Sequence, residues 1–288
     1  MRRIAAMRHR IRLGSLLAVT LWSLMGGSGL HADQPPTVKT IQTEGGVRFA
    51  VLGDKPAKPA PTLIVLAGAA EETLASAYFL QSGVPLGKQG YLCVSIDLPC
   101  HGQDVMAGEG GGIAGWRKRL EADKPLMSDL GRRGKAMLDY LVANGYTDVE
   151  KIAATGTSRG GFSALHLAAQ DPRIRCVAAM APVTDLFVVT EFKGMMHPER
   201  AAALSVSNLA NELANRNVWL VIGDRDERVG TDNMIAFGRK LSAVAIEKKF
   251  NSSSIEIHVL AEPQGHTTPK GAAQQSATWI AEQLKTGG

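Results

Sequence analysis

Short apolar segments alternate with amphipathic helical patterns along most of this chain. Six nearly continuous apolar runs are typical of strands that are covered on both faces. They lie at residues 62–68, 91–97, 151–156, 174–182, 218–223 and 255–261. Two earlier segments, 38–43 and 47–53, are predicted to be short strands joined by a turn that starts at Glu44-Gly45-Gly46.

Between these runs, apolar residues recur at helical spacing. The helical patterns run from Leu130 to Val142, from Phe162 to Ala169, from Met234 to Ala245 and from Ala273 to Leu284. Strands that alternate with helices predict an α/β fold, with a mainly parallel, twisted sheet of about eight strands and helices on both faces.

Neither an internal repeat nor a linker divides this pattern, so a single domain is predicted over residues 33–288. Two connections are longer than turns. Residues 98–127 are rich in glycine and are predicted to be irregular, whereas residues 183–216 are expected to form a small cap segment over the edge of the sheet.

The first 32 residues are predicted to be an export signal. An apolar stretch at 16–25, short for a membrane span, follows a basic start made of Arg2, Arg3, Arg8, Arg10 and Arg12. Cleavage is expected near Ala32, with an uncleaved anchor as the alternative. The mature protein is therefore expected in the periplasm or outside the cell, without stable membrane association.

The positive charge of the chain resides in this signal. The whole sequence has 32 basic and 27 acidic residues, a net charge of +5, and residues 1–32 contain five arginines and no acid. The mature protein keeps 27 basic and 27 acidic residues, which gives a nucleic-acid partner no electrostatic support.

Three cysteines are an odd number for an exported chain. Cys93 and Cys176 lie in apolar, strand-like runs, which favours buried free thiols, although a pair between Cys93 and Cys100 stays open. No CxxC pair or His/Cys cluster suggests a metal site, and neither a metal nor an organic cofactor is predicted.

A serine lies between glycines where an apolar strand gives way to a helical pattern. The segment Gly156-Thr157-Ser158-Arg159-Gly160 fits Gly-x-Ser-x-Gly. A sharp strand-to-helix turn would present the hydroxyl of Ser158, and glycine two residues before and after it removes the clash that such a turn creates. The alternative is a glycine-rich turn that contains the serine by coincidence.

A serine nucleophile needs a general base and an acid that orients it. His266 lies in a loop between the last strand and the last helix, which makes it the predicted base; His258 is interpreted as an ordinary strand histidine. Asp224 and Asp226 both follow the strand that ends at Gly223. Position along the chain does not choose between these two carboxylates.

With these residues in place, the sequence resembles the α/β-hydrolase superfamily over residues 47–285, closest to its esterase, dienelactone-hydrolase-like and prolyl-oligopeptidase-like branches. The family's G-x-x-D-x-x-V pattern matches Gly223, Asp226 and Val229, so the resemblance selects Asp226. The family's Gly-His loop matches Gly265-His266. Its D-x-P-G-H-G turn is similar to residues 97–102, where Cys100 replaces a glycine.

The resemblance also implies an oxyanion hole built from two backbone N–H groups. One belongs to Arg159, the residue after the nucleophile, and alignment on Ala67-Gly68-Ala69 assigns the other to Ala69. The Arg159 side chain could bind a substrate carboxylate, but a structural pair with an acid such as Asp185 is the favoured interpretation.

The resulting prediction is an exported serine hydrolase that cleaves small carboxylic esters through Ser158, His266 and Asp226. A serine peptidase of the prolyl-oligopeptidase type is the first alternative, because the same triad cleaves amides; the chain has no room for the propeller of those peptidases. A non-catalytic binding protein is the second. Phe192, Met195 and Met196 are expected either to line the substrate pocket or to pack the core; the oligomeric state is left open.

Overall fold

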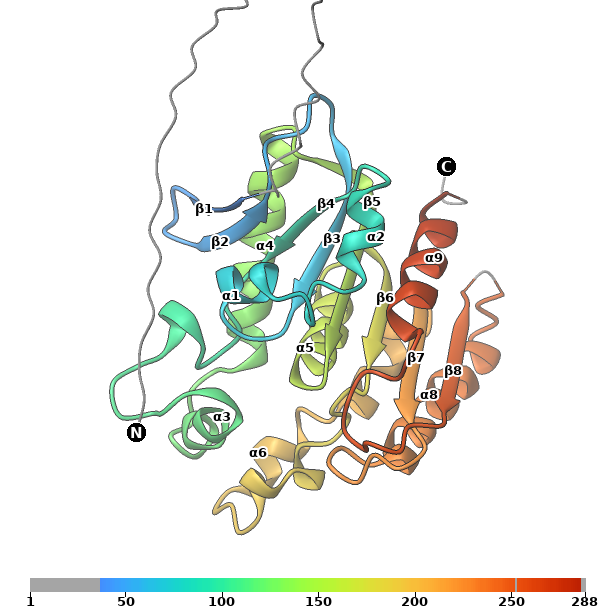
Figure 1. The fold of residues 1–288 in the computed structure, drawn as a ribbon. Helices are drawn as coiled ribbons and strands as arrows, with labels where there is room; N and C mark the ends of the chain where they lie inside the picture. The colour runs from blue at the N-terminus through green and yellow to red at the C-terminus, as the bar shows by residue number, and fades with distance from the viewer. Residues whose placement is uncertain (1–36, 252, 286–288) are drawn as a thin grey trace, which may run out of the picture. The chain divides into compact units, whose positions relative to one another are not determined.

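A mixed sheet of eight strands forms the centre of the computed structural model, which describes residues 37–251 and 253–285 (Figure 1). The strands are β1 (Val38–Gln42), β2 (Arg48–Leu52), β3 (Ala60–Leu66), β4 (Leu92–Ser95), β5 (Thr147–Thr157), β6 (Ile174–Met180), β7 (Asn217–Gly223) and β8 (Ile255–Leu260). Their order across the sheet is β1-β2-β4-β3-β5-β6-β7-β8. The predicted α/β fold with a mainly parallel sheet is confirmed.

The two N-terminal strands form the antiparallel edge of the sheet. β1 pairs with β2, and β2 pairs antiparallel with β4. The turn between them closes through a 2.9 Å hydrogen bond from the Thr43 amide to the Val47 carbonyl, and Gly46 takes a φ of +80° there. The hairpin expected from the sequence is therefore present.

From β3 onward every pairing between neighbouring strands is parallel. The carboxyl ends of β3, β5, β7 and β8 consequently meet at one edge of the sheet, where ligands bind in open α/β sheets. The loops that follow these four strands contain all the residues proposed for the chemistry.

Helices cover both faces of the sheet. The longer ones are α3 (Gly112–Glu121), α4 (Met127–Ala143), α5 (Arg159–Gln170), α8 (Thr231–Glu247) and α9 (Ala272–Lys285); the shorter ones are α1 (Ala70–Ala75), α2 (Gly83–Gly87), α6 (Pro198–Ala202) and α7 (Ala210–Leu213). One core contains residues of α3, α4, α5 and α8, and the other contains residues of α1, α2 and α9. Figure 1 shows α9 and α2 on the opposite side of the sheet from α4 and α5.

The glycine-rich connection at 98–127 is more ordered than the sequence suggested. Helix α3 lies inside it, because Ile113, Trp116 and Leu120 recur at helical spacing and are buried in the larger core. Gly108, Gly110 and Gly112 take positive φ values in the irregular part that leads into this helix. The prediction of an irregular segment was therefore wrong for Gly112–Glu121.

Cys93, Cys100 and Cys176 are buried free thiols. Burial raises the pKa of the Cys93 and Cys100 thiols to about 12, so neither is a reactive thiolate at neutral pH. Within residues 37–251 and 253–285, no helix is both long enough and apolar enough to cross a membrane. The predicted export signal lies outside the described residues.

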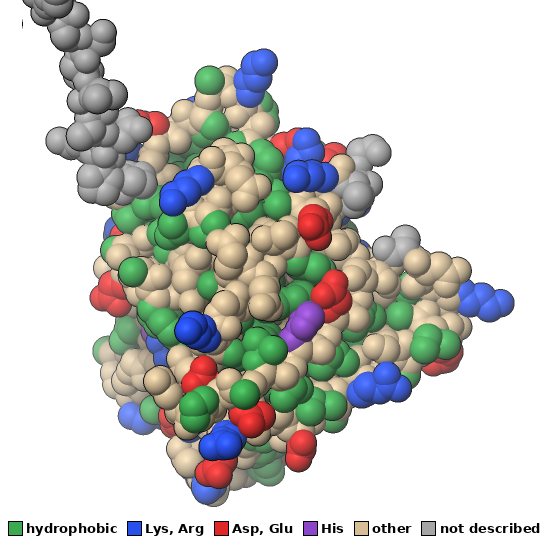
Figure 2. Space-filling model, turned by 45° about the vertical axis from the view of Figure 1, so that its right-hand side comes forward, with side chains coloured by type: hydrophobic (Ala, Val, Ile, Leu, Met, Phe, Trp, Pro, Cys, Tyr) green, Lys and Arg blue, Asp and Glu red, His purple; other side chains and the backbone are tan. Residues whose placement is uncertain are grey.

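Charged side chains of both signs are scattered over the face of the molecule in Figure 2. On the face shown in Figure 2, acidic and basic groups alternate among apolar and polar side chains, and no large patch of one charge stands out. This mixture agrees with the equal numbers of acidic and basic residues that follow residue 32 in the sequence.

Candidate active site

Ser158 occupies the sharp turn between β5 and α5. Its φ of 57° and ψ of −117° fall in a region that residues with a Cβ rarely adopt. The Ser158 amide donates to the Met180 carbonyl at 2.9 Å, and the Ser158 carbonyl accepts from Phe162 and Val183. These backbone bonds offset the strain and fix the direction of the hydroxyl.

Gly156 and Gly160 lack a side chain because the end of β3 lies against the turn. A Cβ on Gly160 would stand 1.8 Å from the Leu66 carbonyl oxygen. A Cβ on Gly156 would stand 2.3 Å from the Gly160 carbonyl carbon. Neither position has room for even a methyl group, so the steric role that the sequence suggested for both glycines holds in the structure.

Ser158, His266 and Asp226 form one chain of hydrogen bonds. The Ser158 Oγ lies 2.9 Å from Nε2 of His266, and Nδ1 of His266 lies 2.8 Å from Oδ2 of Asp226. Since an ionised carboxylate only accepts, Nδ1 carries the proton and Nε2 is left to accept the serine hydroxyl. This is the tautomer that a general base for Ser158 requires.

Asp226 is buried behind His266 and is held by its own loop. Its second oxygen, Oδ1, accepts from the amides of Arg228 at 3.1 Å and Val229 at 3.2 Å. The side chain has no exposed surface. The carboxylate therefore cannot turn toward solvent without giving up three hydrogen bonds.

Asp224 contacts a different group. Its Oδ1 accepts from the Glu262 amide at 2.8 Å, at the start of the loop that contains His266, and its Oδ2 lies 3.7 Å from Nε of Arg225. It therefore anchors the histidine loop, while Asp226 contacts the histidine itself. Sequence position did not choose between Asp224 and Asp226, and these contacts show that Asp226 is the one bonded to His266.

Two further side chains, which the sequence analysis did not identify, hold the histidine loop. The Thr268 amide donates to the Tyr78 hydroxyl at 3.1 Å, and Nε2 of Gln81 donates to the Thr268 hydroxyl at 2.9 Å. Both Tyr78 and Gln81 lie in the segment after α1. Because they are some 190 residues from Thr268 in the chain, no local pattern could have indicated this contact.

The amide of Ala69 is available at the end of β3. On either side of it, the Gly68 amide donates to the Thr73 hydroxyl at 3.2 Å and the Ala70 amide donates to Oδ1 of Asp97 at 2.7 Å. Among the described residues, the amides of Ala69 and Arg159 have no acceptor. Both N–H groups predicted for the oxyanion hole are thus free to donate to a substrate.

The Arg159 side chain does not pair with Asp185. Its Nε donates to the Ala67 carbonyl at 2.7 Å, whereas Asp185 caps a short helical turn by accepting from the Phe187 amide. The expectation of an ion pair was wrong because a helical side chain points toward the N-terminus of its helix. That direction takes Arg159 across the end of β3 toward Ala67.

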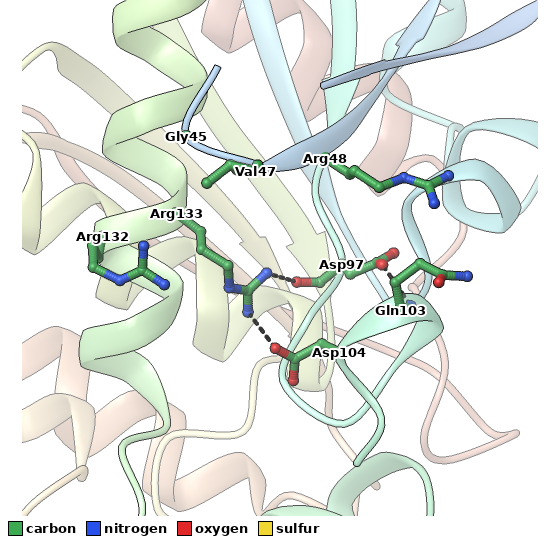
Figure 3. A pocket seen from close by; sticks show the side chains of 9 residues that line it. Gly45, Val47, Arg48, Asp97, Gln103, Asp104, Arg132 and Arg133 are labelled. Atoms are coloured by element: carbon green, nitrogen blue, oxygen red, sulfur yellow. Dashed lines mark hydrogen bonds and ion pairs between the residues drawn. The ribbon is translucent and has the colours of Figure 1, made fainter. Parts of the chain in front are cut away.

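A network of buried ions fixes the loop beside Arg159. Arg133 of α4 donates to the Asp97 carbonyl at 2.8 Å and lies 3.3 Å from Asp104 (Figure 3). Arg119 of α3 also binds Asp104, at 2.6 Å, and reaches Glu109 at the same distance. Cys100 keeps a φ of 60° here, the left-handed conformation that the glycine of the resembling turn would adopt freely.

The other histidines are placed elsewhere. His166 is buried in α5 and its Nε2 lies 2.9 Å from the Leu204 carbonyl; burial lowers its pKa to about 4. His258 packs against Trp219 and pairs with Glu256 at 3.0 Å, as expected for a strand histidine. Of the histidines in the described part of the chain, His266 is the one bonded to Ser158.

The segment 183–216 packs against both α3 and the loop of Asp226. Arg117 of α3 donates to the carbonyls of Lys193 and Gly194, and Arg228 binds Glu191 at 2.6 Å. Phe192 and Met195 are buried in the larger core, which favours the packing interpretation for them. Met196 is exposed, and substrate contact by these three residues stays a prediction.

Comparison with known proteins agrees with this geometry. A profile of the prolyl oligopeptidase family matches residues 134–286, more than half of the chain, and the match includes Ser158, Asp226 and His266. The chain belongs to the prolyl oligopeptidase family. It is therefore a serine hydrolase of the α/β-hydrolase superfamily. A search of curated proteins finds no match.

Solved structures share the fold at low sequence identity. A protein assigned as dipeptidyl aminopeptidase IV from Bacteroides ovatus is 16% identical, with a TM-score of 0.64 over 88% of this chain and 36% of that protein. Acetyl xylan esterase 1 from Thermoanaerobacterium is 16% identical, with a TM-score of 0.58 over 87% and 89%. A cold-adapted esterase from an Arctic intertidal metagenomic library is 17% identical, with a TM-score of 0.61 over 86% and 93%.

The chain thus spans about a third of the first of these proteins and nearly all of the two esterases. At these identities the likeness shows the fold. Within residues 37–251 and 253–285, no group of three His, Cys, Asp or Glu side chains is arranged to hold a metal ion.

We expect Gly160→Ala to destabilise the protein by about 3 kcal/mol, because the new methyl group must push backbone atoms of β3 aside. Gly87→Ala is the matched control: its Cβ meets no atom within 4 Å, and alanine favours the helix. Urea unfolding of the two variants measures the difference. Equal midpoints for both would contradict the steric role of Gly160.

Proposed function

We propose that the protein hydrolyses carboxylic esters through Ser158, His266 and Asp226. The observation that carries the proposal is the hydrogen-bond chain of 2.9 and 2.8 Å from the serine to a buried carboxylate. A serine hydroxyl becomes a nucleophile when a base takes its proton as it attacks. His266 is the group within reach of that proton.

The reaction begins when the Ser158 Oγ attacks the ester carbon and its proton moves to Nε2 of His266. The imidazolium that forms is stabilised by the buried Asp226 carboxylate. The negative charge on the former carbonyl oxygen is accepted by the amides of Ala69 and Arg159 and by the positive end of α5. His266 then gives its proton to the leaving oxygen as the C–O bond breaks, the alcohol departs, and a water molecule attacks the acyl-enzyme in the same way to release the acid.

Two considerations favour esters over peptides. The unprotonated nitrogen of an amide leaves far less easily than an alkoxide or aryloxide, so amide cleavage depends on proton transfer to the leaving nitrogen, whereas esters need less assistance. The chain also aligns with nearly the full length of two esterases, one acting on acetyl xylan by its name. A serine peptidase remains the second candidate, because the family match is to prolyl oligopeptidases.

We further infer that the enzyme works outside the cytoplasm on small-molecule esters. Residues 1–32 have the basic start, short apolar stretch and small residues of a cleavable signal. After their removal the equal numbers of basic and acidic residues provide no attraction for nucleic acid. Catalysis by this triad needs no metal or organic cofactor.

The ester proposal is tested by comparing 4-nitrophenyl acetate and butyrate with 4-nitroanilides of amino acids and short peptides. We expect ester turnover that Ser158→Ala lowers about 10⁵- to 10⁶-fold in kcat, as when a catalytic serine is removed from such a triad. Ser242→Ala is the control, since its hydroxyl donates within α8 to the Gly238 carbonyl. Rapid anilide cleavage with negligible ester cleavage would make the protein a peptidase instead.

The two aspartates near His266 are separated by Asp226→Asn and Asp224→Asn. We expect Asp226→Asn to lower kcat about 10⁴-fold, because an amide donor opposite Nδ1 favours the wrong histidine tautomer. The Asp224→Asn side chain still has an oxygen to accept the Glu262 amide, so kcat should change less than about tenfold. A loss at Asp224 as large as that at Asp226 would refute the assignment.

A further inference from the structure

The guanidinium of Arg159 lies at the edge of the candidate active site without a carboxylate partner. Its Nε is bound to the Ala67 carbonyl at 2.7 Å, and its two terminal nitrogens have no hydrogen-bond or ion-pair partner among the described residues. The side chain is partly buried, and this burial lowers the pKa of Arg159. Because these terminal nitrogens are not among the buried polar atoms that lack a partner, they remain accessible to a ligand.

Gly68, which has no side chain, lies between this guanidinium and His101. A Cβ built on Gly68 would stand 3.5 Å from Nη2 of Arg159 and 3.2 Å from Cδ2 of His101. The arginine and the histidine therefore flank the same glycine, which is the residue before the free amide of Ala69. Any other residue at 68 would place a side chain between them.

His101 supplies the opposite wall in a neutral form. Its Nδ1 lies 2.9 Å from the Pro99 carbonyl and donates to it, while Nε2 has no partner among the described residues. Burial, together with the charge of Arg159, lowers the pKa of His101. The imidazole of His101 is therefore uncharged, and the positive charge beside Gly68 belongs to Arg159.

The acids nearest to His101 in the loop are already engaged. Both oxygens of Asp97 accept backbone amides, from Ala70 at 2.7 Å and Gln103 at 2.8 Å. Asp104 is bound by two arginines of helices α3 and α4. Neither carboxylate is free to neutralise Arg159, and the N-terminus of α5 adds further positive potential.

We propose that Arg159 binds a carboxylate of the substrate, so that the preferred esters carry a carboxylate a few atoms from the scissile bond. The inference rests on the proposed ester hydrolysis and names its substrate class. The planar guanidinium keeps one nitrogen on the Ala67 carbonyl and presents the other two to a carboxylate. Because the guanidinium lies beside Gly68, the residue before Ala69, the bound anion would lie next to the predicted oxyanion hole.

A purely positioning role for Arg159 makes a different prediction. The bond to Ala67 also holds the segment that contains Ala69, so its loss would slow every ester by the same factor. Carboxylate binding, by contrast, changes the ratio of kcat/KM between charged and uncharged esters. The ratio is therefore the quantity to measure.

Three esters test this proposal. 4-Nitrophenyl valerate carries no charge. Mono-4-nitrophenyl glutarate carries a carboxylate on its acyl part, and 4-acetoxybenzoate carries one on its alcohol part. We expect Arg159→Gln to lower the charged-to-uncharged ratio about 10- to 100-fold for one carboxylate ester, as hydrogen bonds to a charged group imply. Arg159→Lys should restore part of it. The ester affected identifies the side of the scissile bond that Arg159 contacts.

Arg239→Gln is the control, because it removes the same charge from an exposed position on α8. It should leave the ratio unchanged. Thermal unfolding of each variant shows that it is folded. A ratio that Arg159→Gln leaves unchanged for both carboxylate esters, whether or not the overall rate falls, overturns the proposal.

Binding of glutarate, measured by calorimetry, separates this inference from the proposed function. Wild-type protein that binds glutarate about tenfold or more tightly than Arg159→Gln supports the carboxylate site even if no ester is cleaved. Wild-type protein that cleaves 4-nitrophenyl valerate but binds glutarate no better than Arg159→Gln overturns the carboxylate site while the esterase function stands.

Discussion

The close approach of the α5 N-terminus to the end of β3 is the contact on which the site depends. It is possible because Gly156 and Gly160 leave room for the Leu66 carbonyl. The same turn holds Ser158 in a strained conformation, and the Arg159 amide that follows it has no acceptor among the described residues. One packing constraint thus fixes the position of the proposed nucleophile before any substrate is present.

Asp226 and His266 are brought to Ser158 by strands of the other half of the sheet. Parallel pairing from β5 through β8 brings the loop of Asp226 and the loop of His266 to the carboxyl-end edge of the sheet, where Ser158 also lies. Long-range side-chain bonds then fix the loops: Asp224 holds Glu262, and Tyr78 holds Thr268. The precision of the triad therefore depends on residues that take no part in the chemistry.

The sequence predicted the features that arise from local patterns. Alternating apolar runs indicated the sheet, and glycines around Ser158 indicated the turn, because sterics acts between near neighbours in the chain. Features set by distant contacts escaped it. The expected pairing of Arg159 with Asp185 was wrong because Nε of Arg159 donates to the distant Ala67 carbonyl. The helix Gly112–Glu121 was missed for another reason: the glycines before it indicated an irregular segment, although Ile113, Trp116 and Leu120 recur at helical spacing. The choice between Asp224 and Asp226 needed the family pattern, and the contacts with His266 and Glu262 show why the two differ.

The central claim is that the strained Ser158 is an activated nucleophile with His266 as its base. Reaction with a fluorophosphonate, followed by mass spectrometry of the digested protein, measures this directly. The account predicts covalent modification at Ser158 in folded wild-type protein, and a rate at least about a thousandfold lower in His266→Ala, because the base has gone. Modification that is absent from the folded wild type, or that proceeds equally fast without His266, would contradict it.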